Sequence, residues 1–184
     1  MTEEIIIAGF GGQGVLSMGK ILAYSGVMQN KEVSWMPSYG PEMRGGTSNV
    51  TVIISDERIS SPTLSAYDSA IILNQQSLDK FEKTVKPGGV LVYDPNGITN
   101  HPTRKDINIY QVAGTEKAGE LGNSKLFNMI MLGGFLKLKP IVNPEFIEKG
   151  LQKSLPERHH RLIPENLKAI ECGSEILEVV NLVV

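Results

Sequence analysis

A short apolar strand followed at once by a glycine-rich turn stands near the start of the chain. Residues 4–9 form an Ile-rich run that predicts a buried strand, and residues 13–29 carry apolar side chains at helical spacing. Between them, Gly9, Gly11 and Gly14 satisfy a G-x-G-x-x-G spacing. Glycines here allow a tight strand-to-helix turn and the close approach of an anion to the helix N-terminus. The chain is therefore expected to begin as a Rossmann-like α/β domain.

The rest of the sequence alternates between strand and helix patterns. Strands are expected at residues 33–37, 47–55, 69–74, 89–93 and 107–112, and helices at residues 75–84, 123–138, 144–154 and 164–178. Only nine residues, 38–46, separate the strands at 33–37 and 47–55, which is short for a parallel crossover. That pair is expected to be antiparallel. The sequence thus predicts a three-layer α/β domain with a mostly parallel but mixed sheet.

The stretch 154–164, rich in proline and charge, is the candidate boundary. It predicts an α/β domain over residues 1–155 and a C-terminal loop and helix extension over residues 156–184, whose helix reaches away from the body. Residues 158–161 (Arg-His-His-Arg) form a basic loop within the extension. This loop is either a solvated surface or a contact for an acidic partner or a phosphate.

The glycine loop has more than one possible use. A dinucleotide site also needs a carboxylate at the end of the second strand to hold the ribose. Residues 33–37 contain none, which argues against a nicotinamide or flavin site. A closely packed turn and a loop that contacts an anion or another subunit both remain open. Both interpretations involve the same five residues, namely Gly9, Gly11, Gly12, Gln13 and Gly14.

Residues 37–48 form a second irregular loop, in which prolines and glycines fix the backbone. If the second strand runs parallel to the first, this loop lies beside the glycine loop, because strand ends of one direction share one edge of the sheet. Arg44 could then offer a planar donor fork to a phosphate or carboxylate. The alternative is a solvent-facing hairpin loop with an internal contact between Glu42 and Arg44.

Composition excludes several classes of function. The chain has 184 residues and a formal net charge of −2, which gives no general attraction to nucleic acid or to anionic membranes. No apolar run approaches the roughly 20 residues that cross a bilayer, and the acidic start does not resemble a signal peptide, so a cytoplasmic location is expected. Cys172 is the single cysteine. It cannot form an internal disulfide, and it cannot supply the ligands of an iron–sulfur cluster or a structural zinc site.

The segment 123–138 is apolar nearly all round, which indicates a helix buried on all sides or covered by a partner. Gly133 and Gly134 within it suggest close backbone packing, because glycine inside a helix costs roughly 1 kcal/mol relative to alanine. Core packing and a subunit interface both remain open for this helix.

Three segments together resemble the gamma subunit of 2-oxoacid:ferredoxin oxidoreductases. They are residues 9–15 (Gly-Phe-Gly-Gly-Gln-Gly-Val), residues 38–46 (Ser-Tyr-Gly-Pro-Glu-Met-Arg-Gly-Gly) and residues 122–133, from Gly-Asn-Ser to Asn-Met-Ile-Met-Leu-Gly. The resemblance covers about residues 3–155. The second segment is the specific one, and its version with Met43 is most similar to the 2-oxoglutarate branch, with the indolepyruvate and pyruvate branches still open.

The resemblance implies a chain that works inside a larger enzyme. That enzyme oxidises a 2-oxoacid with coenzyme A to acyl-CoA, carbon dioxide and reduced ferredoxin. Thiamine diphosphate, Mg²⁺ and [4Fe–4S] clusters are expected on partner subunits, with none of them tightly bound here, and coenzyme A is a co-substrate. The expected partners are alpha and beta subunits, a ferredoxin-like delta subunit in some assemblies, and ferredoxin, with no nucleic acid and no membrane.

The two loops and the third segment supply the candidate binding residues for coenzyme A or substrate. They are Gly9, Gly11, Gly12, Gln13, Gly14, Ser38, Tyr39, Arg44, Gly45, Gly46 and Asn123. No catalytic residue and no metal ligand is expected on this chain. Two alternatives remain: a stand-alone nucleotide-binding enzyme, and a purely structural subunit in which these loops contact another chain.

Overall fold

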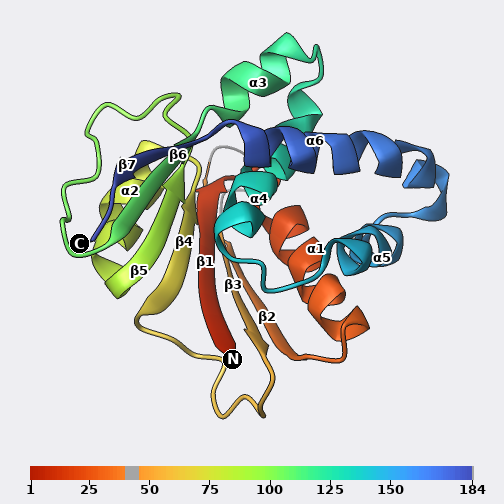
Figure 1. The fold of residues 1–184 in the computed structure, drawn as a ribbon, viewed down its shortest axis with the longest axis horizontal. Coiled ribbons are helices and arrows are strands. Elements are labelled where there is room, and N and C mark those ends of the chain that lie inside the picture. Colours follow the sequence, from red (N-terminus) through yellow and green to blue (C-terminus); the bar gives the residue numbers. More distant parts are fainter. Residues whose placement is uncertain (40–45, 184) are drawn as a thin grey trace.

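The computed structural model describes residues 1–39 and 46–183 of the chain and shows a twisted sheet with helices on both faces (Figure 1). The strands are β1 (Thr2–Phe10), β2 (Glu32–Tyr39), β3 (Thr47–Ser55), β4 (Tyr67–Ile72), β5 (Val85–Tyr93), β6 (Asn108–Val112) and β7 (Leu177–Asn181). The α-helices are α1 (Val15–Met28), α2 (Gln75–Phe81), α3 (Gly114–Glu120), α4 (Phe127–Leu138), α5 (Pro144–Ser154) and α6 (Ile163–Glu175). Short 3₁₀ turns cover Glu82–Thr84, Ser124–Leu126 and Glu157–Leu162.

The sheet is mixed, as the sequence predicts. Its order across the described residues is β2-β3-β1-β4-β5-β6-β7. The pairs β1–β4, β4–β5 and β5–β6 are parallel. Strand β3 is antiparallel to both of its neighbours, and β7 is antiparallel to β6. Because β1 and β2 are both antiparallel to β3, they run in the same direction and end at the same edge of the sheet.

Strand β1 contributes side chains to two separate cores, one on each face of the sheet. The sheet and the helices on its two faces are the three layers. Ile5 and Ile7 pack into the larger core with α1, α4, α5 and α6. Ile6 and Ala8 point to the other face and pack with α2. All four side chains are fully buried, so this part of β1 is covered on both faces of the sheet.

Helices α4 and α6 cross at a pair of glycines. A Cβ built on Gly133 would lie 1.9 Å from the Ile170 carbonyl oxygen, and one built on Gly173 would lie 1.8 Å from the Ile130 oxygen. The close packing suggested by Gly133 is therefore confirmed, and its partner is another helix of the same chain. Most of α4 is buried in the core, which favours the core-packing interpretation of this segment.

The C-terminal segment differs from its expected form in two ways. Its helix packs against α4 instead of reaching away from the body, and it ends at Glu175. The last residues of the helix expected at 164–178 instead begin β7, which lies at the edge of the sheet. The division of the chain near residue 155 into two folding units stays a prediction.

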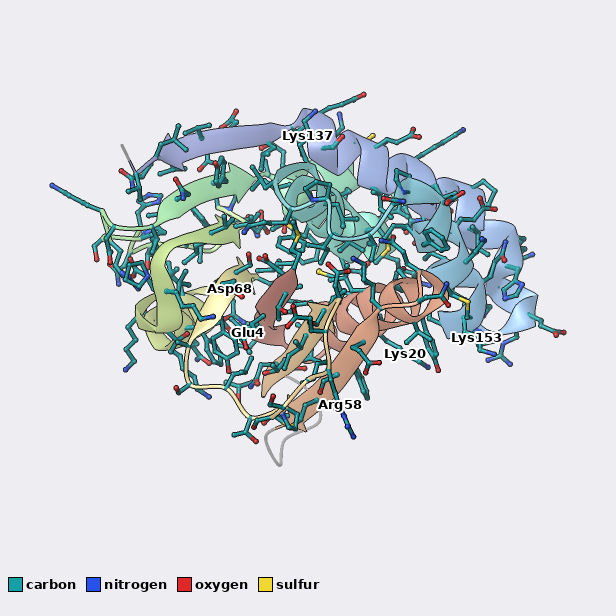
Figure 2. All side chains as sticks on the ribbon, turned by 60° about the horizontal axis from the view of Figure 1, so that its bottom comes forward. Glu4, Lys20, Arg58, Asp68, Lys137 and Lys153 are labelled. Atoms are coloured by element: carbon teal, nitrogen blue, oxygen red, sulfur yellow. The ribbon has the colours of Figure 1, made fainter. Side chains whose placement is uncertain are left out.

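An ion-pair network holds three strands together at the edge opposite the glycine loop. The Lys86 ammonium lies 2.6 Å from Glu4 Oε2 and 2.7 Å from Asp68 Oδ1. The Glu4 backbone N–H also donates to Asp68 Oδ2, and Glu4 and Asp68 lie side by side in Figure 2. Partial burial opposes the charge of Lys86, but the hydrogen bonds that it donates to Asp68 and Glu4 raise its pKa above the ordinary value. Among the described helices, none has the length and apolar character required to cross a membrane.

Candidate functional site

The glycine loop and the end of the second loop meet at one edge of the sheet. The Gly11 backbone N–H donates to the Gly46 carbonyl oxygen at 3.1 Å. Phe10 pairs with Thr47, and Tyr39 pairs with Ser48, in the last positions of the two antiparallel ladders. The expectation that the two loops lie side by side is thus met at Gly46.

Gln13 fastens the glycine loop to the neighbouring strand. Its Oε1 accepts a hydrogen bond from the Phe10 N–H at 2.6 Å, and its Nε2 donates to the Leu73 carbonyl at 3.0 Å. Asn74 Nδ2 also donates to Gln13 Oε1, at 3.4 Å. The side-chain amide of this candidate binding residue is therefore engaged inside the protein. In this arrangement Gln13 shapes the loop and does not present its amide to a ligand.

Glycine is required where the loop turns into α1. Gly14 is the N-cap residue with φ 79° and ψ 17°, a left-handed conformation that disfavours side chains. A Cβ there would also lie 2.4 Å from Asn128 Nδ2, at the start of α4. Among the described residues, no side chain caps this helix end. The first-turn N–H groups of α1 have no acceptor within the helix, as at any helix N-terminus.

The remaining glycines differ in exposure. Gly9 is buried beneath Gln13 and Leu73, so it serves close packing. Gly11 is half-buried and Gly12 is exposed, with φ 101°. Gly12 is therefore the point of the loop that is most open to a ligand or a partner.

Asn123 lies at a separate groove beside α1. The groove has a volume of about 540 Å³, and its lining includes Ser17, Asn123, Asn128, His159 and Arg161. Asn123 donates to Glu165 Oε1 at 2.9 Å and accepts from the Lys125 N–H at 3.2 Å. The groove thus joins the third motif segment to the basic loop 158–161, and Asn128 connects it to Gly14.

Part of the second loop lies outside the described residues. Arg44 and Gly45 fall there, and so does the proposed contact between Glu42 and Arg44. Ser38 is exposed on the edge strand β2, where it pairs with Asn49. The backbone of Tyr39 ends β2.

Two further polar residues, Asn74 and Asp94, lie at the same edge of the sheet, and the sequence did not predict them as site residues. Asn74 follows β4 and accepts from the Ser77 N–H at 2.8 Å, which caps α2. Asp94 follows β5, is 1% exposed, and accepts from Thr115 Oγ1 at 2.5 Å. Burial raises the pKa of Asp94, against the hydrogen bonds from Thr115, Asn96 and Gly114. Their position directly after apolar strands was the signal that could have found both residues.

The donor set of this chain suits binding and orientation better than metal or cluster chemistry. Among the described residues, no group of three His, Cys, Asp or Glu side chains is arranged to hold a metal ion. Cys172, half-buried on α6, is the single thiol of the sequence, and a cluster needs several.

Comparison with known proteins gives a consistent set of relatives. The family model for pyruvate ferredoxin/flavodoxin oxidoreductase matches residues 4–176. The 2-oxoglutarate synthase subunit KorC of Methanocaldococcus jannaschii is 36% identical, over 96% of this chain and 94% of the relative. The ketoisovalerate oxidoreductase subunit VorA of Methanothermobacter marburgensis is 37% identical over 94% of this chain, which spans only 36% of that longer protein.

Solved structures share the fold. The gamma subunit of a keto/oxoacid ferredoxin oxidoreductase from Geobacter sulfurreducens superposes with a TM-score of 0.81 at 30% identity, covering 96% of each chain. A 2-oxoglutarate:ferredoxin oxidoreductase from Magnetococcus marinus, solved with 2-oxoglutarate, coenzyme A and succinyl-CoA, gives a TM-score of 0.85 at 22% identity. This chain corresponds to 33% of that chain and shares its fold.

Proposed function

Because the chain belongs to the pyruvate ferredoxin/flavodoxin oxidoreductase family, we propose that it serves as the gamma-type subunit of a 2-oxoacid:ferredoxin oxidoreductase complex. The complex would oxidise a 2-oxoacid with coenzyme A to acyl-CoA, carbon dioxide and reduced ferredoxin. The matches to KorC over nearly its whole length support 2-oxoglutarate as the substrate. The similar identity to VorA makes ketoisovalerate the competing substrate.

The role proposed for this chain is to position coenzyme A at the carboxyl edge of β1. The observation that carries it is the hydrogen bond from Gly11 to Gly46, which joins the two motif loops beside the N-terminus of α1. Arg44 precedes Gly46 by two residues in the sequence. The first-turn N–H groups and a guanidinium fork together suit a phosphate or a carboxylate. Neither group is a nucleophile or a base, so the contribution is binding and orientation.

A stand-alone dinucleotide enzyme fits less well. A ribose-binding carboxylate would stand at the end of the second strand, and here β3 separates that strand from β1 and its glycine loop. Ser38 and Tyr39 occupy that end of the strand. A purely structural role for the loops, in contact with another chain, is the outcome that the experiment must separate.

The test is Arg44→Ala, assembled with the partner subunits and followed in both half-reactions. We expect the KM for coenzyme A to rise roughly tenfold, equivalent to a loss of about 1.4 kcal/mol of uniform binding. Decarboxylation without coenzyme A should barely change. Arg44→Lys keeps the charge without the fork and should fall between Arg44→Ala and the unmodified chain.

The matched control is Arg58→Ala, because Arg58 is exposed in the segment after β3, at the opposite end of that strand from Gly46. It should leave the KM unchanged. An unaltered dependence on coenzyme A in the Arg44 variant, or a loss of assembly in its place, would assign these loops to a subunit interface.

A further inference from the structure

The edge strand β7 and the residues after it expose a row of apolar side chains. Val179, Val180, Leu182 and Val183 retain 60%, 45%, 49% and 43% of their accessible surface. Soluble domains seldom leave contiguous apolar patches uncovered unless something binds there. This segment follows residue 176, where the family match ends.

A bulge explains why neighbouring valines both face solvent. Val179 pairs with Tyr110 and Asn181 pairs with Ile109, so Val180 has no partner across the ladder. The extra residue breaks the alternation that would otherwise turn one valine inward. Strand β7 thus exposes Val179 and Val180 to solvent together.

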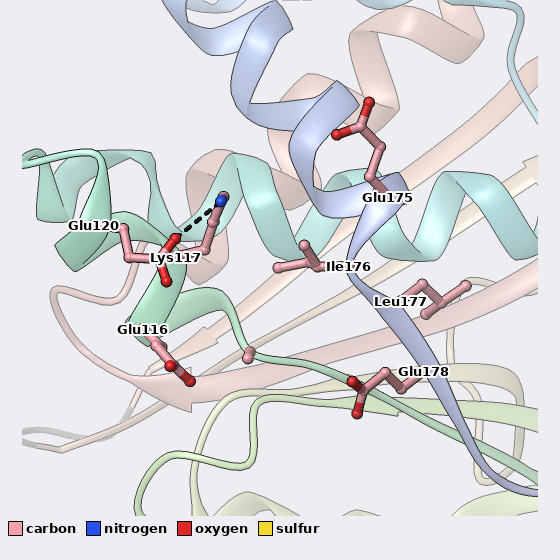
Figure 3. Close-up of a pocket in the computed structure, with 8 residues that line it drawn as sticks. Glu116, Lys117, Glu120, Glu175, Ile176, Leu177 and Glu178 are labelled. Atoms are coloured by element: carbon pink, nitrogen blue, oxygen red, sulfur yellow. Dashed lines mark hydrogen bonds and ion pairs between the residues drawn. The ribbon is translucent and has the colours of Figure 1, made fainter.

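A hollow lined by four carboxylates adjoins the start of this apolar row, because its lining ends at Glu178, the residue before Val179. Glu116 and Glu120 project from α3, and Glu175 and Glu178 from the junction of α6 and β7, around a hollow of about 300 Å³ (Figure 3). All four are exposed. Lys117 is the cation in this lining, and it pairs with Glu120 at 2.9 Å. The hollow therefore keeps a net negative charge beside Ile176 and Leu177.

The charge determines which kind of partner fits. We call the four glutamates together with Val179, Val180, Leu182 and Val183 the β7 surface. A symmetric dimer would place this surface against its own copy and bring glutamates against glutamates, which like-charge repulsion disfavours. A segment with apolar residues and lysine or arginine beside them complements both parts of the surface.

We propose that the β7 surface docks an apolar segment flanked by lysine or arginine, supplied by another subunit of the complex. This inference rests on the proposed role as a complex subunit. It concerns the edge of the sheet away from β1, so it does not depend on coenzyme A binding at the glycine loop. The valines supply the buried area, and the glutamates set the orientation and speed the encounter.

The experiment measures assembly of the full-length chain with the co-expressed alpha and beta subunits, by affinity capture of the tagged chain and by surface plasmon resonance. Two variants test the two halves of the surface, Glu116→Lys/Glu175→Lys and Val179→Ser/Val180→Ser. Each variant is expected to raise the dissociation constant roughly tenfold or more. The effect of charge reversal should shrink at high salt, where exposed charges are screened.

Each variant has a matched control on another face. Glu57→Lys/Glu148→Lys makes the same change in net charge at exposed positions after β3 and on α5. Val27→Ser removes an exposed valine from α1, where 50% of its surface is accessible. Both should assemble as the unmodified chain does. Circular dichroism and thermal unfolding establish that every variant is folded before its affinity is compared.

The outcomes separate this inference from the proposed function. Unimpaired assembly of both β7 variants would overturn the inference and leave the subunit role intact. A valine effect without a glutamate effect would overturn the basic character of the partner. Self-association through β7, seen as protection of its amides from hydrogen exchange in the isolated chain, would replace the partner by a second copy. No assembly of the unmodified chain would overturn both proposals.

Discussion

Replacing Gly133 by alanine should weaken the contact between α4 and α6. The added Cβ would lie 1.9 Å from the Ile170 carbonyl oxygen, which belongs to the backbone and cannot rotate away. Carbon and oxygen atoms pack no closer than about 3.3 Å in ordinary contacts. The two helices would therefore have to separate by more than 1 Å, at a position where both are packed in the core.

The magnitude follows from two opposing effects. Overpacking of a well-packed core costs about 1–3 kcal/mol, and sometimes more. Alanine recovers about 1 kcal/mol of helix propensity relative to glycine. Because the clash is with rigid backbone, we expect the upper part of the first range and a net loss of about 2 kcal/mol. For a domain of this size, that lowers Tm by roughly 4–8 °C.

The assay is thermal and urea unfolding of Gly133→Ala, with Gly119→Ala as the control. A Cβ on Gly119, in α3, would meet nothing within 4 Å, so this variant should gain a few tenths of a kcal/mol up to about 1 kcal/mol. Gly173→Ala makes the reciprocal clash, 1.8 Å from the Ile130 oxygen. The double variant should lose less than the two single losses together, because the first substitution already separates the helices. An unchanged or raised Tm for Gly133→Ala would refute the reasoning.

Three further predictions concern the strand edges. Gln13→Ala removes the bonds that fasten the glycine loop to Leu73 and should cost about 1–3 kcal/mol in urea unfolding, and an unchanged unfolding midpoint would contradict the fastening role. Burial raises the pKa of Asp94, so its ionisation costs stability as pH rises from the unfolded value of about 3.9 through the raised folded value. Asp94→Asn should therefore gain relative to the unmodified chain over that window, and a constant difference across pH would exclude the effect. The Lys31 ammonium, with the N-terminal amine second, lowers the pKa of Asp56 to about 2. Asp56→Asn should therefore be less stable than the unmodified chain above pH 4, and this difference in stability should vanish as pH falls toward 2. Unfolding midpoints of both proteins measured across that pH range will check this.

The sequence predicted the strands and the long helices well, because these elements bury continuous or periodic apolar residues. It missed α3, where Gly114 and Ala118 are the buried positions, so no apolar period marks the helix. It extended the last helix into the first two residues of β7, because the apolar Ile176 and Leu177 follow the helical pattern directly. Valines are compatible with either element in such a short run, and pairing with β6 decides for the strand.

The candidate site was predictable in its backbone and not in its side chains. The glycine spacing identified the turn, and the short connection after residue 37 correctly predicted the antiparallel pair β2–β3. The function of Gln13 depends on Leu73, which is 60 residues away, and the packing of Gly14 depends on Asn128, 114 residues away. Contacts of that range follow from the three-dimensional arrangement of the strands and helices, which local patterns do not specify.

The subunit role is tested most directly by reconstituting the complex with and without this chain. The purified alpha and beta subunits would be assayed for 2-oxoglutarate- and coenzyme A-dependent reduction of ferredoxin, with ketoisovalerate as the competing substrate. The account predicts that the isolated chain has no activity, that it joins the other subunits in stoichiometric amount, and that its addition restores coenzyme A-dependent turnover. Full turnover by the other subunits without this chain, or catalysis by this chain alone, would contradict it.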